Sequence, residues 1–98
     1  MFVIAYSYES RDPDDFERVY GPKGEWVDFF RGGRGFVGTE LLRELDNPGR
    51  YLVLDRWESR ETFEQFATEH QSEYFRRSEE ARVYYLQELQ LGVYENVW

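Results

Sequence analysis

Two side chains of this sequence are suited to proton transfer near neutral pH. His70 is the only histidine among the 98 residues, and imidazole is the side chain that titrates closest to neutrality. Asp55 lies within the largely apolar run 51–57, where a carboxylate must either pair with a base or line a wet cavity. We take His70 and Asp55 as the candidate catalytic residues, each as a general acid or base.

The surroundings of His70 indicate a side chain that points inward. It falls on an apolar stripe of a predicted helix together with Phe63, Phe66, Ala67 and Tyr74. It is therefore either a core histidine bonded to a neighbour or an acid–base group in a pocket. No metal site is expected, because one histidine beside one carboxylate is a poor ligand set.

Asp55 has two interpretations of its own. Strand alternation places its side chain on the same face as those of Tyr51 and Trp57. The carboxylate either forms an ion pair with an arginine such as Arg43 or Arg82, or lines a cavity. The chain must turn sharply after Trp57, so the next helix should run back across this face. Asp55 would then lie between the sheet and that helix.

Aromatic side chains make up 19% of the chain, with three Trp, eight Tyr and eight Phe. They can fill a core, an oligomer interface or a flat pocket for a planar ligand. In a pocket, a tyrosine hydroxyl would orient a phenolic or carbonyl group. The candidate substrate-binding residues are Tyr6, Glu40, Tyr51, Trp57 and Tyr74. The alternative for the rings is core or dimer packing, and Glu40 is open to the same two interpretations as Asp55.

Composition excludes several other kinds of chemistry. The absence of cysteine rules out disulfides, thiolate metal sites and a cysteine nucleophile. The net charge of −8 makes nucleic acid a poor partner. The glycine-rich run 32–35 precedes a predicted strand rather than a helix, so it indicates a turn and not a phosphate cradle. With no flavin, haem, nucleotide or metal pattern, we expect no cofactor.

Length and apolar runs predict where the chain resides. At 11.9 kDa, residues 1–98 are expected to form one domain. The longest apolar run is far below the ~18 residues of a membrane helix, so no membrane partner is expected. The N-terminus has no basic segment of the kind that opens a signal peptide. We therefore expect a soluble, cytoplasmic protein.

The first half of the chain must supply a strand and a broken helix. Residues 2–9 are β-branched and aromatic, which predicts a strand. Asp12 followed by Pro13 is typical of a helix start. Helical spacing continues to residue 30, with an interruption at residues 21–24.

The second half predicts a hairpin, helices and a closing strand. Residues 36–45 and 50–57 are two strands joined by the turn 46–49. Ser59 is the expected N-cap of the next helix. A second helical stretch is predicted from about residue 78, and residues 91–97 form the closing strand. The apolar positions of that second stretch are Ala81, Tyr85, Leu86 and Leu89.

The resulting order is β-α-β-β-α-β. It predicts an α+β, ferredoxin-like fold with a four-stranded antiparallel sheet and helices on one face. Residues 2–8 are apolar on both faces of their strand, so the second face also needs a cover. A second copy of the chain is the simplest cover, which predicts a homodimer.

Three segments resemble the antibiotic biosynthesis monooxygenase family. They are residues 35–43 (GFVGTELLR), 46–52 (DNPGRYL) and 56–59 (RWES). The resemblance implies a dimeric α/β barrel in which two sheets pack face to face, with a ligand pocket in each subunit between sheet and helices. Relatives of this kind include cofactor-free monooxygenases of polycyclic aromatic phenols, haem-degrading enzymes and small-molecule isomerases.

The haem-degrading branch does not match residue by residue. Phe66 and Arg76 stand where that branch carries a tryptophan and a histidine ligand, and residues 6–8 lack its asparagine. The resemblance therefore implies a cofactor-independent monooxygenase of an aromatic, phenolic or polyketide-like molecule. Asp55 or His70 would be the base, and Trp57 and Tyr51 would form walls. The alternatives are a non-redox small-molecule-binding or isomerase-like dimer, and a dimer whose pocket is closed by aromatic rings.

Overall fold

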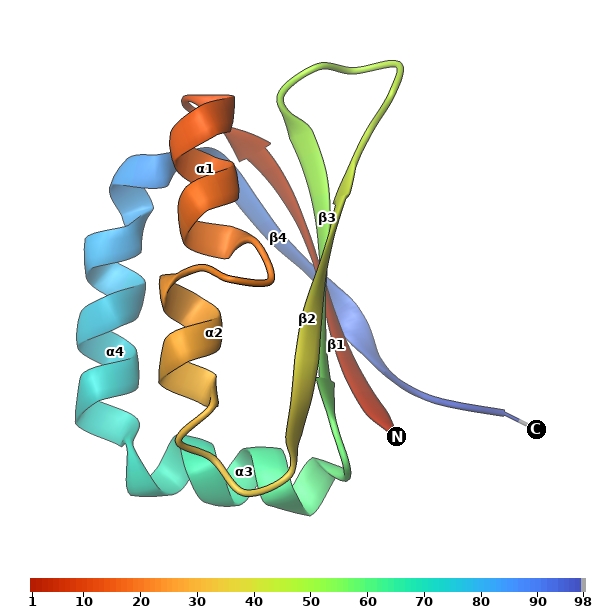
Figure 1. The fold of residues 1–98 in the computed structure, drawn as a ribbon, viewed down its shortest axis with the longest axis vertical. Helices are drawn as coiled ribbons and strands as arrows, with labels where there is room; N and C mark the ends of the chain where they lie inside the picture. Colours follow the sequence, from red (N-terminus) through yellow and green to blue (C-terminus); the bar gives the residue numbers. More distant parts are fainter. Residues whose placement is uncertain (98) are drawn as a thin grey trace.

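The computed structural model describes residues 1–97, and its centre is a four-stranded antiparallel sheet with the helices packed against one face (Figure 1). The strand order is β2-β3-β1-β4. The strands are β1 (Phe2–Ser10), β2 (Phe36–Arg43), β3 (Arg50–Trp57) and β4 (Tyr85–Glu95). The α+β, ferredoxin-like fold predicted from the sequence is confirmed.

Each crossover between strands contains two helices rather than one. The helical elements are α1 (Pro13–Tyr20), α2 (Glu25–Phe30), α3 (Arg60–Glu69), α4 (Gln71–Glu80) and a short 3-10 turn (Ala81–Tyr84). The predicted interruption at residues 21–24 separates α1 from α2. None of the helices within residues 1–97 is long and apolar enough to cross a membrane.

Side-chain caps fix where α1 and α3 begin. The Asp12 carboxylate accepts hydrogen bonds from the backbone N–H groups of Asp14 and Asp15, at 3.0 and 3.4 Å. At α3, Ser59 Oγ accepts a bond from the Thr62 N–H at 3.2 Å. Both helix starts agree with the prediction, because capping depends on residues that are adjacent in the sequence.

The prediction for residues 71–90 was wrong in two respects. The second helix of this half begins at Gln71 rather than near residue 78, and β4 begins at Tyr85 rather than at residue 91. Tyr85, Leu86 and Leu89 therefore lie on a strand. Their spacing fits a helix, but β1 presents a free edge on this side, and pairing with β1 satisfies the backbone of this segment.

The helix-covered face of the sheet holds the core. Tyr51, Val53, Asp55 and Trp57 alternate onto this face of β3 and are all buried. Trp57 is completely enclosed, and Phe30, Phe36, Phe63 and Phe66 surround its ring at 5.2–5.8 Å between centroids. Aromatic packing thus joins the sheet to α2 and α3.

The opposite face of the sheet carries no helix of residues 1–97 (Figure 1), and it combines apolar side chains with a few polar ones. Register places Ala5, Leu54 and Glu40 in one row across β1, β3 and β2. Ser7, Leu52 and Leu42 form the next row. Leu42 on β2 and Leu89 on β4 are exposed, with 41% and 54% of their surface accessible. We call this surface the open face.

Gly33, between α2 and β2, lies directly against the aromatic core. A Cβ atom at this position would come within 2.6 Å of Phe66 Cδ1 and 2.9 Å of Trp57 Cζ3. At the neighbouring Gly32, the nearest atom would be the Phe29 carbonyl oxygen at 3.5 Å, an ordinary contact. Core density therefore requires glycine at position 33 but not at position 32.

Gly33→Ala is expected to lower the free energy of unfolding by about 1–3 kcal/mol, because the added methyl group displaces two enclosed rings. Urea denaturation at pH 7 measures the change. Gly32→Ala is the matched control and should leave the midpoint nearly unchanged. Equal midpoints for the two variants would show that the loop does not pack as described.

Candidate functional site

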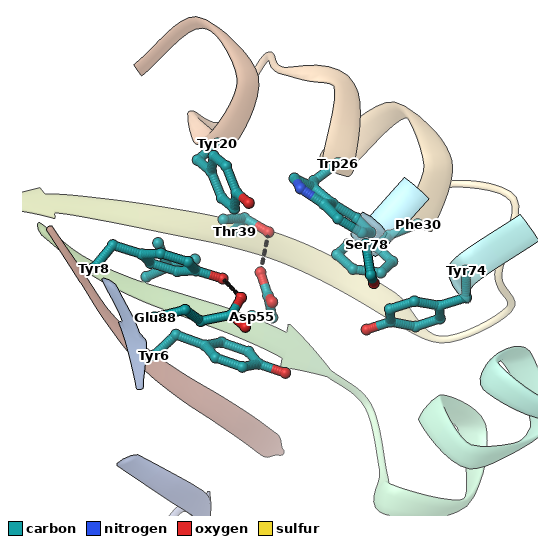
Figure 2. A pocket seen from close by; sticks show the side chains of 11 residues that line it. Tyr6, Tyr8, Tyr20, Trp26, Phe30, Thr39, Asp55, Tyr74, Ser78 and Glu88 are labelled. Carbon is teal, nitrogen blue, oxygen red and sulfur yellow. Dashed lines mark hydrogen bonds between the residues drawn. The ribbon is translucent and has the colours of Figure 1, made fainter. Parts of the chain in front are cut away.

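A pocket lies between the helix-covered face of the sheet and the helices α1, α2 and α4 (Figure 2). Its cavity volume is about 60 Å³. The lining residues are Tyr6, Tyr8, Tyr20, Trp26, Phe30, Thr39, Val53, Asp55, Tyr74, Ser78 and Glu88. We call this space the inner pocket.

A larger hollow of about 470 Å³ adjoins the inner pocket. We call it the vestibule. The two share five lining residues, which makes them parts of one site. The shared residues are Tyr6, Tyr20, Trp26, Ser78 and Glu88. The remaining vestibule residues come from the end of α4, the 3-10 turn and β4.

Asp55 forms part of the floor of the inner pocket. Strand β2 pairs with β3 so that Thr39 lies opposite Asp55, and Thr39 Oγ1 donates a hydrogen bond of 2.6 Å to Asp55 Oδ1 (Figure 2). The Asp55 residue is 7% exposed. Within residues 1–97 it forms no ion pair. The two arginines expected as its partners pair elsewhere, Arg43 with Glu17 at 2.9 Å and Arg82 with Glu79 at 3.5 Å.

Burial changes the proton affinity of Asp55. Loss of solvent raises its pKa from 3.8 to about 6, although the hydrogen bond from Thr39 opposes this shift. A carboxyl group with a pKa in this range can accept and return a proton near neutral pH. The inner pocket therefore contains one group suited to acid–base chemistry.

Four tyrosines supply hydroxyl groups around this carboxylate. Burial and, after it, the nearby charges of Asp55 and Glu88 raise the pKa of Tyr6 to about 12. Burial also raises the pKa of Tyr8, Tyr20 and Tyr74, so these hydroxyls remain neutral and can donate hydrogen bonds. Tyr8 Oη donates to Glu88 Oε2 at 2.5 Å (Figure 2).

Aromatic rings of α2 and α4 form the wall opposite the polar floor. Trp26 stacks on Phe30 at 5.5 Å between centroids and contacts Tyr74 at 5.7 Å. Figure 2 shows Trp26 and Phe30 on the helix side, with Asp55 and Glu88 across the space. A flat apolar wall facing a carboxylate and several hydroxyls suits a planar ligand with oxygen substituents.

The structure brings three of the sequence-predicted residues into the inner pocket: Asp55, Tyr6 and Tyr74. Tyr51 shares the face of Asp55, as alternation predicts, but its hydroxyl donates to Glu17 Oε2 at 2.5 Å and it does not line the inner pocket. Trp57 is likewise enclosed in the core and does not line it.

His70 and Glu40 also lie outside the inner pocket. His70 is the residue between α3 and α4, and its ring lies 4.5 Å from that of Phe66. Glu40 projects from the open face, where it pairs with Arg56 at 2.9 Å. The residues predicted from the sequence therefore lie in four places: the inner pocket, the core, the helix junction and the open face.

Sequence reasoning missed most of the wall and one acidic residue. The missed lining residues are Tyr20, Trp26, Phe30, Thr39, Val53, Ser78 and Glu88. Thr39 could have been found from the hairpin register, since it lies opposite Asp55. Glu88 was missed because its segment was interpreted as a helix, whereas pairing places it opposite Tyr8. Among residues 1–97, no cluster of three or more His, Asp or Glu side chains is arranged to hold a metal ion.

Comparison with known proteins identifies both a family and a fold. The sequence model of the antibiotic biosynthesis monooxygenase family matches residues 27–81. The fold is similar to that of SnoaB, a cofactor-independent oxygenase from Streptomyces nogalater, with a TM-score of 0.79 and 20% identity over 99% of this chain and 93% of that chain. It is also similar to PA3566 from Pseudomonas aeruginosa, with a TM-score of 0.69 and 12% identity over 99% and 94%. No curated protein sequence matches this chain.

The buried carboxyl group should make stability depend on pH. The folded-state pKa of Asp55 is raised from 3.8 to about 6. The stability that the protonated carboxyl group contributes to the fold is therefore fully present below about pH 4, and it is lost as the pH rises through 6. Above pH 7, ionisation of the buried carboxyl group lowers the free energy of unfolding by about 3 kcal/mol. Asp55→Asn should therefore be more stable than the wild type at pH 8, by about 1–3 kcal/mol, and nearly equal to it at pH 4.

Urea denaturation at the two pH values measures this difference. Asp28→Asn, which removes an exposed carboxylate from α2, controls for the change in net charge and should show little of the effect. An Asp55→Asn variant that is less stable than the wild type at pH 8 would contradict the description of Asp55 as an unpaired buried acid.

Proposed function

Because the chain belongs to the antibiotic biosynthesis monooxygenase family, we propose that it is a cofactor-independent monooxygenase of an aromatic, phenolic or polyketide-like small molecule. The observation that carries the proposal is the buried carboxyl group of Asp55, which forms no ion pair within residues 1–97 and faces an aromatic wall. Oxygenation without a cofactor needs a base, donors for a developing enolate and a dry pocket. In this proposal Asp55 is the base, tyrosine hydroxyls are the donors, and the aromatic wall, closed over by the bound substrate, keeps water out.

Asp55 acts as the base in this proposal. With a pKa of about 6, it is mostly ionised at pH 7 and is still basic enough to remove an activated proton from carbon or from a phenol. Thr39 holds one carboxylate oxygen and leaves the other available to the substrate. Deprotonation raises the electron density of the ring system, and the substrate itself then becomes the reductant.

Neutral tyrosine hydroxyls stabilise the anion that forms. Tyr6 and Tyr74 line the same space as Asp55, and burial keeps both protonated because it raises the pKa of each hydroxyl. Hydroxyl donors aimed at a developing oxyanion in a dry pocket stabilise it far more than they would in water. In this proposal they bind the enolate oxygen while Asp55 holds the proton.

The oxygen chemistry balances without an added reductant. For a substrate with a CH2 group beside a phenolic ring, the carbanion passes one electron to O2, and the two radicals combine to form a C–O bond. The peroxide takes up the proton from Asp55. Loss of the second C–H proton breaks the O–O bond, which leaves a carbonyl group and releases water. The substrate supplies all four electrons.

Pocket size constrains how a polycyclic substrate would bind. The cavity of the inner pocket, about 60 Å³, admits the reacting edge of such a molecule, and the vestibule, about 470 Å³, has room for the remaining rings. The reacting carbon would then lie beside Asp55, and Trp26, which lines both spaces, would stack along the ring system.

A non-redox isomerase is the second candidate function. Asp55 can remove a proton from one carbon and return it to another without O2, and the same tyrosines would stabilise the enolate between the two steps. The observation that favours it is that Asp55 can exchange protons near neutral pH. Oxygen consumption distinguishes the two candidates.

We also propose that the protein forms a homodimer through the open face. Ala5, Leu52 and Leu54 lie at its centre, and exposed Leu42 and Leu89 lie beside them. Exposed apolar side chains gathered on one sheet face are typical of an interface, and a second copy presents a matching surface. We expect an interface of obligate type, above about 2,000 Å² in total.

Oxygen uptake with hydroxynaphthalene or anthrone substrates tests the proposed activity. The wild type should consume O2, with kcat/KM rising as the pH passes through about 6 because Asp55 must be ionised to act as base. Asp55→Asn should lower kcat by at least about 100-fold and abolish that limb of the profile. His70→Asn, altered outside the pocket, should retain nearly full activity.

A substrate that binds and is rearranged without O2 consumption would replace the monooxygenase by the isomerase. A His70→Asn variant as inactive as Asp55→Asn would contradict the assignment of the base. Folding of each variant is checked by circular dichroism, so that loss of structure is not mistaken for loss of chemistry.

Leu54→Arg should separate the proposed dimer, because it places a charge at the centre of the open face. Sedimentation equilibrium should give twice the 11.9 kDa chain mass for the wild type and the single chain mass for the variant. Val83→Arg, on the exposed surface of the 3-10 turn, is the matched control and should leave the mass unchanged. A monomeric wild type at micromolar concentration would contradict the dimer.

A further inference from the structure

The charged side chains around the site are mostly of one sign. Asp55 and Glu88 line the inner pocket, and none of its lining residues within residues 1–97 is a Lys, Arg or His. The vestibule adds Glu79 and Arg82, which pair with each other at 3.5 Å. The Glu88 carboxylate is therefore not balanced by a cation among the residues that line the site.

Glu88 occupies the boundary between the two spaces. It lies on β4 opposite Tyr8, lines both the inner pocket and the vestibule, and accepts the 2.5 Å hydrogen bond from Tyr8 Oη. Figure 2 shows its carboxylate directed into the space beside Asp55. Its field also reaches the opposite wall, because its charge contributes to the raised pKa of Tyr74 on α4, after burial, Tyr6 and Asp55.

Resting on the proposed function, we propose that Glu88 is a specificity-determining residue that restricts the site to aromatic substrates without an anionic group. A ligand that fills both spaces must pass this carboxylate. A carboxylate or sulfonate on the ligand would meet a like charge with no free cation among the described lining residues to offset it, which is unfavourable at close range. Neutral phenols, ketones and esters would not meet this repulsion.

Arg82 does not reverse this preference. Its guanidinium is exposed and already paired with Glu79, so an anionic ligand that reached it would have to displace an existing partner. The Asp55 carboxylate adds to the repulsion whenever it is ionised. The preferred substrate class is therefore neutral, planar and hydroxylated.

Binding of two matched probes tests the inference without relying on turnover. The probes are 2-naphthol and 6-hydroxy-2-naphthoate, which differ by one carboxylate, and their dissociation constants are measured by calorimetry at pH 7.5 and low salt. The wild type should bind the neutral probe at least about fivefold more tightly. Glu88→Gln should reduce this ratio to about twofold or less, mainly by improving the binding of the anionic probe.

Two further variants separate charge from structure. Tyr8→Phe removes the hydrogen bond to Glu88 but keeps its charge, so the wild-type ratio should persist. Glu64→Gln removes an exposed charge from α3 and controls for net charge. Equal binding of both probes by the wild type, an unchanged ratio in Glu88→Gln, or failure of both probes to bind would overturn the inference. Absence of O2 consumption alongside the expected ratios would overturn only the proposed function.

Discussion

The burial of one face of β3 is the constraint on which the site depends. Trp57 and Val53 must lie under the helices to complete the core, and strand alternation then places Asp55, between them, on the same face. A one-residue shift of β3 that moved Asp55 to the open face would move Trp57 there as well. Pairing with β2 places Thr39 opposite Asp55 as its hydrogen-bond donor. The register that builds the core therefore also positions the carboxyl group.

Local signals in the sequence predicted much of this fold. The capped starts of α1 and α3, the break between α1 and α2, and strand β3 depend on neighbouring residues, and they lie where expected. The segment 71–90 could not be predicted in the same way. Helical spacing at Tyr85, Leu86 and Leu89 was overridden by pairing with β1, a contact between residues far apart in the chain.

The candidate site shows the same division between local and distant information. Alternation along one strand was enough to put Asp55 on the helix side, but choosing between a cavity and an ion pair required the distant partners of Arg43 and Arg82. His70 fitted the predicted apolar stripe, but the helix ends at this residue. At the junction between α3 and α4 its ring packs against Phe66 and does not line the cavity. Glu88 required the β4 register, which no local pattern contained.

The unpaired Asp55 also has a consequence for how this chain would respond to selection. A buried acid without a cation weakens the fold at neutral pH, so mutation under selection for thermal stability alone would favour its replacement by an uncharged residue. A lineage that keeps the carboxylate therefore keeps a fold that is less stable at neutral pH than it would be with an uncharged residue. Persistence of an acid at position 55 among distant relatives, beside freely varying surface positions, would therefore record selection for activity rather than for folding.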